Sequence, residues 1–319
     1  MKYDIVGIDS PCMDMVVNLN SFPEPNNGGQ IQNLSWQGGG KVATGMVAAA
    51  RLGAKGAILG AVGDDVYGRF CDRDFLRHGI DTAHLQKRKG QTTGFSIVLS
   101  NRETMGRSII YMTGTAEPLC HEEIPAEYLT NTKYFFVAML NEVVNRAIDT
   151  AKTAGAKICI DADFYTEDLR DIIPKVDVFI ASEFVYEALF HDDDYEANCR
   201  KIMDRGPEIV VFTFGEKGCV GLSGEGYFEI PAFQVDAVDT VGAGDVYHGA
   251  FLAGLLKGLP VVEVARMASA VSAIKCTRIG GRAGIPDMDT VQHFMRTGEI
   301  DYTEIDARVE FYKRGIEHI

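Results

Sequence analysis

The sequence predicts an α/β protein: a doubly wound, mostly parallel sheet flanked by helices, with a small antiparallel β lid. Three observations support this fold class. Short apolar runs of strand length alternate with amphipathic segments of helix length along most of the chain. Two other stretches alternate polar and apolar residues, which is typical of antiparallel strands with one buried face. The composition, with 46% hydrophobic and 24% charged residues among 319, is that of a globular protein with a large core.

The elements of the main sheet follow one another in βαβ order. The pattern predicts strands at 3–8, 57–62, 134–140, 157–160, 176–180 and 209–213, and helices at 43–52, 68–78, 143–154 and 199–204. The first strand stops at the turn-forming Asp9-Ser10-Pro11. The first two helices stop at Gly53 and Gly79, and glycine is the residue that most readily ends a helix. The later runs are rich in Val, Ile and Phe, as strands buried on both faces are.

The lid is expected from residues 15–36 and 92–113, where apolar residues such as Phe95, Ile97 and Leu99 recur at every second position. A flap inserted between βαβ units lies near the carboxyl ends of the strands, where such sheets bind ligands. We therefore expect three parts. They are a main nucleotide- and substrate-binding domain of 1–10, 38–91 and 114–296, a β lid of 11–37 and 92–113, and a C-terminal helical tail of 297–319.

The charge balance argues against two classes of partner. There are 31 Lys and Arg against 45 Asp and Glu, so the net charge is −14, and no basic run offsets it. Such a surface repels phosphate backbones and anionic lipids, so we expect no nucleic-acid and no membrane partner. The seven cysteines form no Cys-x-x-Cys pair, and Asp4 and Asp9 interrupt the apolar stretch that a signal peptide would need. These features predict a cytoplasmic protein with reduced thiols.

Residues 233–251 are the most informative segment. An apolar strand is expected over 233–238, a turn of small residues follows, and a helix begins near Asp245. Gly242 to Gly244 leave backbone N–H groups open at a helix N-terminus, which attracts anions. A carboxylate beside a bound phosphoryl group suits a general base for an attacking hydroxyl. Alone, the same residues could form a tight turn and a helix cap. His248 is expected in a polar network rather than as a catalytic partner.

Three further segments favour the catalytic interpretation. They are GGGKVATGMVAAARLG at 38–53, VGDDVYG at 62–68 and TFGEKG at 213–218. Together with DTVGAGD at 239–245, they resemble the ribokinase (PfkB) family of carbohydrate and nucleoside kinases. The matches occur in the family's order and extend from Val6 to Pro286, and DTVGAGD with the following Gly-Ala-Phe is highly specific. That family has a doubly wound α/β domain with a small β lid, in agreement with the pattern above.

The resemblance implies roles for particular residues. Asp245 corresponds to the catalytic base, and the backbone of Gly242, Ala243 and Gly244 to the anion hole for the transferring phosphoryl group. The substrate-binding residues that it implies are Asp14, Gly39, Gly40, Lys41, Thr44 and Asn141. We add Arg107, on a predicted lid strand, because it could reach an anionic group, although a solvated arginine fits its position equally well.

The resemblance also implies cofactor sites. The nucleotide pocket would include Thr213, Gly215 and Gly218, together with Gly242 and Gly244. Asp239, with the backbone around Arg278 and Gly280, resembles the monovalent-cation site of some members, which would hold K⁺. The expected cofactors are therefore ATP and Mg²⁺, with K⁺ as a further candidate.

The chain departs from the family at several of these positions. Thr44 stands where relatives usually have Asn, which alters the sugar pocket. The magnesium-organising Asn-x-x-Glu motif falls at 182–185, where both key positions differ, which leaves Glu183 or Glu187 to hold Mg²⁺ through water. Gly284 stands where cation-dependent members often have a hydroxyl group, which argues against activation by K⁺.

The sequence therefore predicts an ATP-dependent kinase that phosphorylates a hydroxymethyl group of a sugar or sugar derivative. A nucleoside kinase of the same family and a non-catalytic sugar-binding relative are alternatives. A remote one is an NAD(P)-dependent oxidoreductase, suggested by the glycines at 38–40, but that fingerprint normally follows the first strand directly. The expected partners are a small-molecule sugar and ATP, and the exposed lid edge favours a homodimer through the lid.

Overall fold

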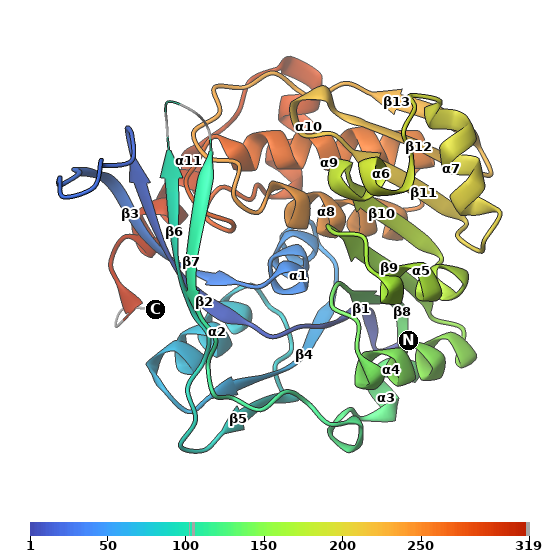
Figure 1. The fold of residues 1–319 in the computed structure, drawn as a ribbon, viewed down its shortest axis with the longest axis horizontal. Coiled ribbons are helices and arrows are strands. Elements are labelled where there is room, and N and C mark those ends of the chain that lie inside the picture. Colours follow the sequence, from blue (N-terminus) through green and yellow to red (C-terminus); the bar gives the residue numbers. More distant parts are fainter. Residues whose placement is uncertain (102, 104–105, 317–319) are drawn as a thin grey trace.

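A nine-stranded sheet forms the centre of the molecule in the computed structural model, which describes residues 1–316 except 102, 104 and 105 (Figure 1). The strands, in spatial order, are β13 (Gly226–Ile230), β12 (Cys219–Ser223), β11 (Ile209–Thr213), β10 (Val178–Ser182), β9 (Lys157–Ala162), β8 (Thr132–Val137), β1 (Tyr3–Ile8), β4 (Gly56–Gly63) and β5 (Leu85–Arg88). From β11 to β5 all neighbours are parallel, and β12 and β13 continue the sheet antiparallel. The expected doubly wound, mostly parallel sheet is confirmed.

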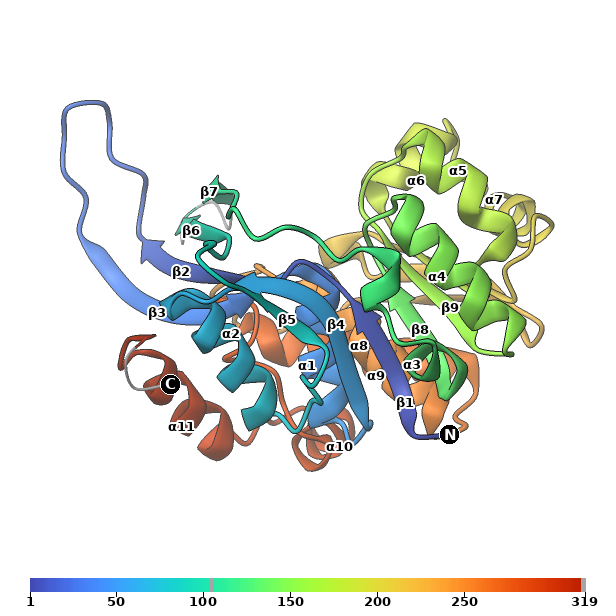
Figure 2. The same cartoon turned by 90° about the horizontal axis from the view of Figure 1, so that it is seen from below.

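Helices cover both faces of this sheet (Figure 2). Alternate residues of each strand enter different cores, so Ile5 packs with the helices of one face and its neighbour Val6 with those of the other. One face carries α1 (Lys41–Arg51), α2 (Val66–Arg77), α8 (Ala243–Leu256), α9 (Val261–Cys276), α10 (Met288–Thr297) and α11 (Thr303–Tyr312). The other carries α3 (Ala126–Thr130), α4 (Glu142–Thr153), α5 (Glu167–Ile172), α6 (Glu183–Leu189) and α7 (Tyr195–Met203). Single 3₁₀ turns lie at His121–Glu123, Ile173–Lys175 and Gly215–Lys217.

The segment before α8 is not the predicted strand. Residues 233–238 form no strand of the described chain, and the N–H of Ala237 donates to the carbonyl of Val235 at 2.9 Å within a tight turn. The N–H of Val238 instead donates to the carbonyl of Cys276 at the end of α9, at 2.7 Å. The rings of Phe233 and Phe294 lie 5.3 Å apart, so Phe233 covers helix α10, while Val238 packs against Val241 and Ile279.

The lid is a separate four-stranded sheet of β3 (Ile31–Gly39), β2 (Cys12–Leu19), β6 (Phe95–Asn101) and β7 (Arg107–Met112), in that order. Its outer pairs, β3 with β2 and β6 with β7, are antiparallel as predicted. The central pair, β2 with β6, is parallel, because these strands reach the lid from separate excursions of the chain. The loop between β2 and β3 projects farthest from the main sheet (Figure 2).

The base of the lid is joined to the main domain near the turn before α8. Val16 of β2 and Val98 of β6 pack with Val241 and Ile279 in a small core of their own. Gln37 of β3 is fully buried, and its amide donates to the carbonyl of Ile279 at 2.9 Å. The lid therefore rests directly on the segments around residues 241 and 279.

The predicted tail is helical over α11, while residues 317–319 lie outside the described residues, as do 102, 104 and 105 of the predicted lid. Ile305 and Tyr312 of α11 are fully buried against this chain's own core. The division into main domain, lid and tail stays a prediction, but α11 is part of the same core as α1 and α2. Within the described residues, no helix is both long enough and apolar enough to cross a membrane.

Candidate active site

Carboxylates gather at the carboxyl ends of the parallel strands. Asp9 follows β1 directly, while Asp161 and Asp163 lie at the end of β9. The carboxyl ends of parallel strands meet at one edge of a sheet, so these side chains lie near one another. All three act electrostatically on Asp245, at the start of α8. This edge is therefore a strongly acidic site.

Two helices begin at this edge and touch there. α1 starts directly after the glycine loop at 38–40, and α8 starts directly after Gly242. A Cβ added to Gly249 of α8 would lie 1.9 Å from the carbonyl oxygen of Gly45 of α1. A Cβ on Gly45 would lie 3.0 Å from the carbonyl oxygen of Asp245. This contact of bare backbones brings the predicted sugar loop beside the predicted base.

The turn into α8 has open N–H groups. Gly242 has a left-handed φ of 73°, and a Cβ there would lie 2.8 Å from the Cα of Gly281, so only glycine fits. The N–H of Ala243 is used within the turn, 3.1 Å from a carbonyl oxygen. The N–H groups of Gly244 and Asp245 lie in the first helical turn, where the helix offers them no acceptor. They are the most available donors of the predicted anion hole.

Asp245 is half-buried, and its surroundings favour a bound proton. Burial raises the pKa of its carboxyl group well above the ordinary value of 3.8. The charge of Asp161 raises this pKa further, Lys41 opposes the rise, and Asp163 and Asp9 add to it. A general base is most effective when its pKa lies near the working pH. The cluster therefore moves Asp245 in the direction that proton abstraction requires.

Lys41 is the cation of this cluster. Its ammonium forms an ion pair with Asp163 and lies 6.0 Å from the centre of the Phe164 ring. Burial disfavours its charge, but Asp161 and Asp163 outweigh burial and raise the pKa of Lys41. A charged lysine at the N-terminus of α1 is thus held by carboxylates, next to the point where α1 and α8 meet.

The glycine loop lies directly against two carboxylates. Asp14 of β2 accepts a hydrogen bond from the hydroxyl of Ser96 on β6, and a Cβ on Gly39 would lie 2.4 Å from its Oδ2. Gly40 has a φ of 99°, and a Cβ there would lie 2.7 Å from Oδ2 of Asp9. Asp9 in turn accepts from an N–H in the first turn of α1 at 2.8 Å. The predicted residues Asp14, Gly39 and Gly40 are therefore brought together.

A buried arginine, which the sequence analysis missed, supports this loop from behind. Arg282 is fully buried and pairs with the equally buried Asp74 at 2.6 Å. It also donates to the carbonyl of Gly39 at 2.9 Å and to the hydroxyl of Thr44 at 3.4 Å. Tyr312 of α11 donates to the other oxygen of Asp74 at 2.5 Å. The available signal was one charged residue within the small and apolar run IGGRAGIP.

Two predicted substrate residues, Asn141 and Arg107, lie outside the glycine loop and its supports. Asn141 caps α4, where its side-chain oxygen accepts from the N–H of Val144 at 2.9 Å, although it lines one small cavity together with Asp9. Arg107 is exposed at the start of β7 and is paired with Ser100. Ser100 is four residues along β6 from Ser96, which holds Asp14, so the Arg107 backbone lies about 13 Å farther out.

The predicted nucleotide residues lie beyond β11. Thr213 is its last residue, and the hydroxyl donates to the carbonyl of Ala181 at 3.4 Å. Gly215 and Gly218 bound the 3₁₀ turn that follows, and both have a positive φ. A Cβ on Gly218 would lie 2.0 Å from a backbone oxygen of the neighbouring strand segment, which explains a glycine there. These residues form one turn at the same edge of the sheet as Asp161.

The predicted monovalent-cation site is filled by a lysine. The carboxylate of Asp239 accepts from the N–H groups of Val241 at 2.9 Å and Gly280 at 2.8 Å. The carbonyl oxygens of Asp239 and Val241 accept from the ammonium group of Lys275. These carbonyl oxygens are thereby engaged, so the residues present do not fit a bound K⁺.

Glu183, the predicted magnesium residue, is the first residue of α6. The hydroxyl of the preceding Ser182 donates to the carbonyl of Asp163 at 2.8 Å and so joins the ends of β10 and β9. Across the described part of the chain, no three His, Cys, Asp or Glu side chains form a ready metal site. Magnesium commonly binds through few carboxylates, keeping water and phosphate oxygens as its other ligands, and Glu183 would fit that mode alone, because the carboxylate of Asp163 is paired with Lys41.

His248 lies buried beside Asp161, beneath the first turn of α8. Its Nδ1 lies 2.7 Å from the carbonyl oxygen of Gly244, and its Nε2 lies 3.3 Å from that of Ile180. A carbonyl oxygen only accepts, so the shorter of these contacts is a hydrogen bond that the ring donates from Nδ1. Asp161 lies 3.6 Å from the same Nδ1, and neither of its oxygens has a hydrogen-bond partner among the described residues. The expected polar network for His248 is confirmed.

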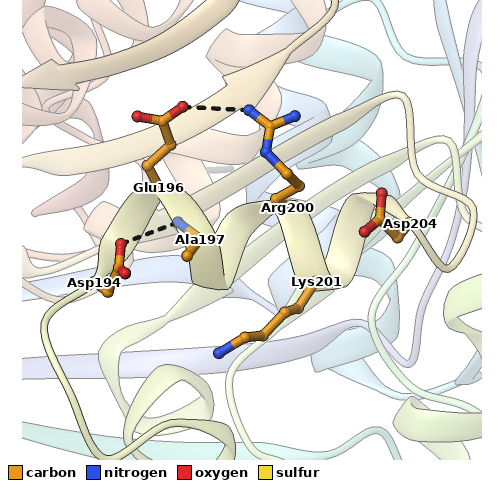
Figure 3. A pocket seen from close by; sticks show the side chains of 6 residues that line it. All are labelled: Asp194, Glu196, Ala197, Arg200, Lys201 and Asp204. Atoms are coloured by element: carbon orange, nitrogen blue, oxygen red, sulfur yellow. Dashed lines mark hydrogen bonds and ion pairs between the residues drawn. The ribbon is translucent and has the colours of Figure 1, made fainter.

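A shallow hollow on the outside of α7 is a second concave feature (Figure 3). Polar groups that line it already have partners on the same helix. Arg200 forms an ion pair with Glu196 at 3.2 Å, and the carboxylate of Asp194 accepts from the N–H of Ala197 at 3.3 Å. No residue of the acidic edge lines it. The candidate site is therefore the acidic edge, where the two helix N-termini meet.

Comparison with known proteins identifies similar chains over nearly the whole length. The model of the pfkB family of carbohydrate kinases matches residues 2–288. A 5-dehydro-2-deoxygluconokinase of Clostridium perfringens is 25% identical, covering 96% of this chain and 97% of that protein. A ribokinase of Haemophilus influenzae is 28% identical, covering 92% and 99%. Among solved structures, an E. coli ribokinase-like protein in complex with ATP and Mg²⁺ superimposes with a TM-score of 0.82 at 19% identity, covering 92% and 99%.

Proposed function

The chain belongs to the pfkB family of carbohydrate kinases and is a phosphotransferase with an alcohol group as acceptor, and on that premise we propose its reaction. It transfers the γ-phosphoryl group of ATP to a hydroxymethyl group of a sugar or sugar derivative. One observation supports this proposal above the others. The glycine contact between α1 and α8 brings the loop at 38–40 next to Asp245 and the open N–H groups of the α8 turn.

Acceptor binding is assigned to the side of α1. The Asp14 carboxylate has two oxygens and can accept hydrogen bonds from neighbouring hydroxyl groups, as a polyhydroxylated ligand requires. Gly39 and Gly40 allow the ligand to approach the backbone of the loop. Arg282 and Asp74 act from behind, because they hold the loop without facing the acceptor. Relatives named for a deoxygluconate derivative and for ribose support a sugar-type acceptor.

Phosphoryl transfer is assigned to the side of α8. Asp245 accepts the proton of the hydroxymethyl group as its oxygen attacks the γ-phosphorus, and the bond from that phosphorus to the β-γ bridging oxygen breaks. The N–H groups of Gly244 and Asp245 donate to the charge that develops on the phosphoryl oxygens. The ammonium of Lys41 adds positive charge from the N-terminus of α1. His248 donates to the carbonyl of Gly244 and keeps this turn in position.

ATP is assigned to the turn of Thr213, Gly215 and Gly218, which lies at the same edge of the sheet. An acidic edge repels the phosphates of ATP, so the nucleotide needs a divalent counter-ion. Mg²⁺, when bound, would supply that neutralisation, with Glu183 holding it through water. The E. coli neighbour in complex with ATP and Mg²⁺ is consistent with this assignment.

The test is release of ADP with ATP and Mg²⁺ across sugars, sugar acids, sugar phosphates and nucleosides. We expect turnover on one sugar class, and Asp245→Asn should lower kcat by about 10²–10⁴-fold with little change in acceptor affinity, as the loss of a general base does. Asp194→Asn is the matched control, because Asp194 also starts a helix but lies on α7, away from the acidic edge. Turnover restricted to nucleosides would reassign the acceptor. ATP binding without turnover on any acceptor would indicate a non-catalytic relative.

A further inference from the structure

Lys275 is a fully buried lysine that the proposed reaction leaves without a role. It is the next-to-last residue of α9, and its ammonium group donates to the carbonyl oxygens of Asp239, at 2.9 Å, and of Val241. It forms no ion pair with any residue that the structure describes. A buried charge is costly unless it is compensated, so a lysine held by carbonyl oxygens calls for a functional explanation.

The two carbonyl oxygens belong to the turn that leads into α8. In a trans peptide unit the C=O and the following N–H share a plane and point in opposite directions. An ammonium bound to the carbonyl of Val241 therefore fixes the direction of the Gly242 N–H. Its bond to the carbonyl of Asp239 fixes the direction of the Thr240 N–H in the same way. Lys275 thus sets the orientation of the peptide units at the entrance to the proposed anion hole.

The surroundings of Lys275 have the chemistry of a monovalent-cation site. Backbone carbonyl oxygens replace the hydration shell of K⁺ in selective sites, and an ammonium group presents the same single positive charge. The carboxylate of Asp239 is 2% exposed and supplies the balancing negative charge, while its oxygens are fixed by the N–H groups of Val241 and Gly280. A Cβ on Gly284 would lie 2.4 Å from the carbonyl oxygen of Lys275, so this end of α9 is closely enclosed.

From these contacts we infer that Lys275 is a tethered ammonium ion that takes the place of a free monovalent cation. Its ammonium orders the turn at 239–242, and phosphoryl transfer is therefore independent of K⁺. This inference rests on the proposed kinase function. Lys275 is a positioning residue, because it acts on the transferring group only through the backbone of the turn.

The first test uses the unmodified protein. Turnover is measured at constant ionic strength in the chloride salts of choline, Na⁺, K⁺ and NH₄⁺. We expect rates within about twofold of each other, since screening by these salts is the same. Stimulation by K⁺ of about tenfold or more over choline, equal to about 1.4 kcal/mol, would overturn the inference.

The second test removes the ammonium. Lys275→Ala leaves a cavity lined by the two carbonyl oxygens, and we expect kcat in choline to fall by about 10²-fold, as when an anion-hole donor is lost. NH₄⁺ or K⁺ should restore much of that loss by entering the cavity, whereas tetramethylammonium should not. Lys275→Met is the matched variant, because its side chain fills the space without a charge and should not respond to cations. Full activity of Lys275→Ala in choline, or loss of activity that no small cation restores, would overturn the inference.

A third readout does not depend on activity. The Tm of Lys275→Ala should rise with NH₄⁺ concentration, because an ion that binds only the folded state stabilises it, while the Tm of Lys275→Met should not. If the unmodified protein phosphorylates no acceptor, the proposed function fails, yet this thermal measurement still tests the cation site. A Tm of Lys275→Ala that is the same in NH₄⁺ and choline would contradict occupancy of the cavity.

Discussion

The carboxyl group of Asp245 is half-buried at the start of α8 and is faced by the carboxylates of Asp161, Asp163 and Asp9. Burial, with these charges, raises the pKa of Asp245 above its ordinary 3.8. The proton is therefore held more tightly in the folded state than in the unfolded state. This contribution to stability is complete below about pH 3.8 and is lost as the pH rises through the folded pKa.

We therefore expect Asp245→Asn to be more stable than the unmodified protein at pH 7, although its turnover should be much lower. An amide carries no charge that burial could penalise, so the difference in Tm should grow from about pH 4 upward and then level off. Each kcal/mol should appear as about 2–4 °C in Tm. Thermal unfolding of both proteins without ligands, followed from pH 4 to 8, measures this difference in Tm. An Asn variant with a lower Tm at pH 7 would show that the carboxylate is compensated in the folded state.

At this scale the sequence could indicate the residues that form local motifs and could not indicate those that act through tertiary contacts. The pattern around Asp245 predicts a helix N-terminus, which the structure has, while the loop at 38–40 was assigned through the family resemblance, and the roles of both stay predictions. Arg282 and Lys275 escaped detection, because their partners Asp74 and Asp239 are 208 and 36 residues away. The sequence alone does not distinguish a buried lysine or arginine from a solvated one, because the difference depends on partners that are distant along the chain.

The contact between α1 and α8 predicts a sharp difference between two glycines of one helix. A Cβ on Gly249 would lie 1.9 Å from a backbone oxygen of α1, whereas a Cβ on Gly244 would meet nothing within 4 Å. Gly249→Ala should therefore push the helices apart and cost about 1–3 kcal/mol of unfolding free energy. Turnover should fall by about 10²-fold, because the acceptor loop moves away from the base. Urea unfolding and steady-state kinetics measure both effects.

Gly244→Ala is the stability control for this prediction. It adds the same methyl group to the same helix in open space, so stability should be unchanged or higher by up to about 1 kcal/mol through helix propensity. Equal destabilisation of both variants would mean that α8 rejects alanine for a reason other than its contact with α1. A Gly249→Ala variant as stable and active as the unmodified protein would show that the close contact between α1 and α8 is needed for neither stability nor activity.

The elements themselves were predictable where burial and periodicity agree. The six strands predicted for the parallel sheet all exist, because a strand buried on both faces is a continuous apolar run that few other structures produce. The strand expected over 233–238 was wrong, because Phe233 packs against Phe294 of helix α10 and not against a neighbouring strand. The sequence also could not predict that β6 pairs parallel to β2. An alternation of polar and apolar residues indicates which face of a strand is buried, but not whether the neighbouring strand is parallel or antiparallel.

The outer edge of the lid predicts how whole molecules associate. β7 is the last strand of the lid sheet, and four consecutive side chains on it, Ile109, Ile110, Tyr111 and Met112, are 51–75% exposed. An exposed apolar edge strand readily pairs with another chain. We expect a homodimer through β7 and expect Ile110→Lys to convert it to a monomer, because a buried lysine opposes pairing. Light scattering during size-exclusion chromatography gives the mass of each species.

The opposite edge of the lid provides the control. Ile31 starts β3 and is 51% exposed, so Ile31→Lys makes the same change at comparable exposure on the other edge strand. It should leave the dimer intact. A monomeric unmodified protein would contradict association through either edge, and a dimer that survives Ile110→Lys would locate the interface elsewhere.

The contact of Arg282 with the loop at 38–40 has a consequence for the order in which the chain folds during synthesis. The loop at 38–40 is made early in synthesis, yet Arg282 holds it only after seven-eighths of the chain exists, and Tyr312 joins Asp74 later still. Chains emerge from the N-terminus onward and fold as they do so. A nascent chain that ends before residue 282 therefore contains the residues of all strands of the parallel sheet but lacks the arginine that holds the loop at 38–40. The proposed acceptor loop is therefore secured last, although its own residues are among the first to be synthesised.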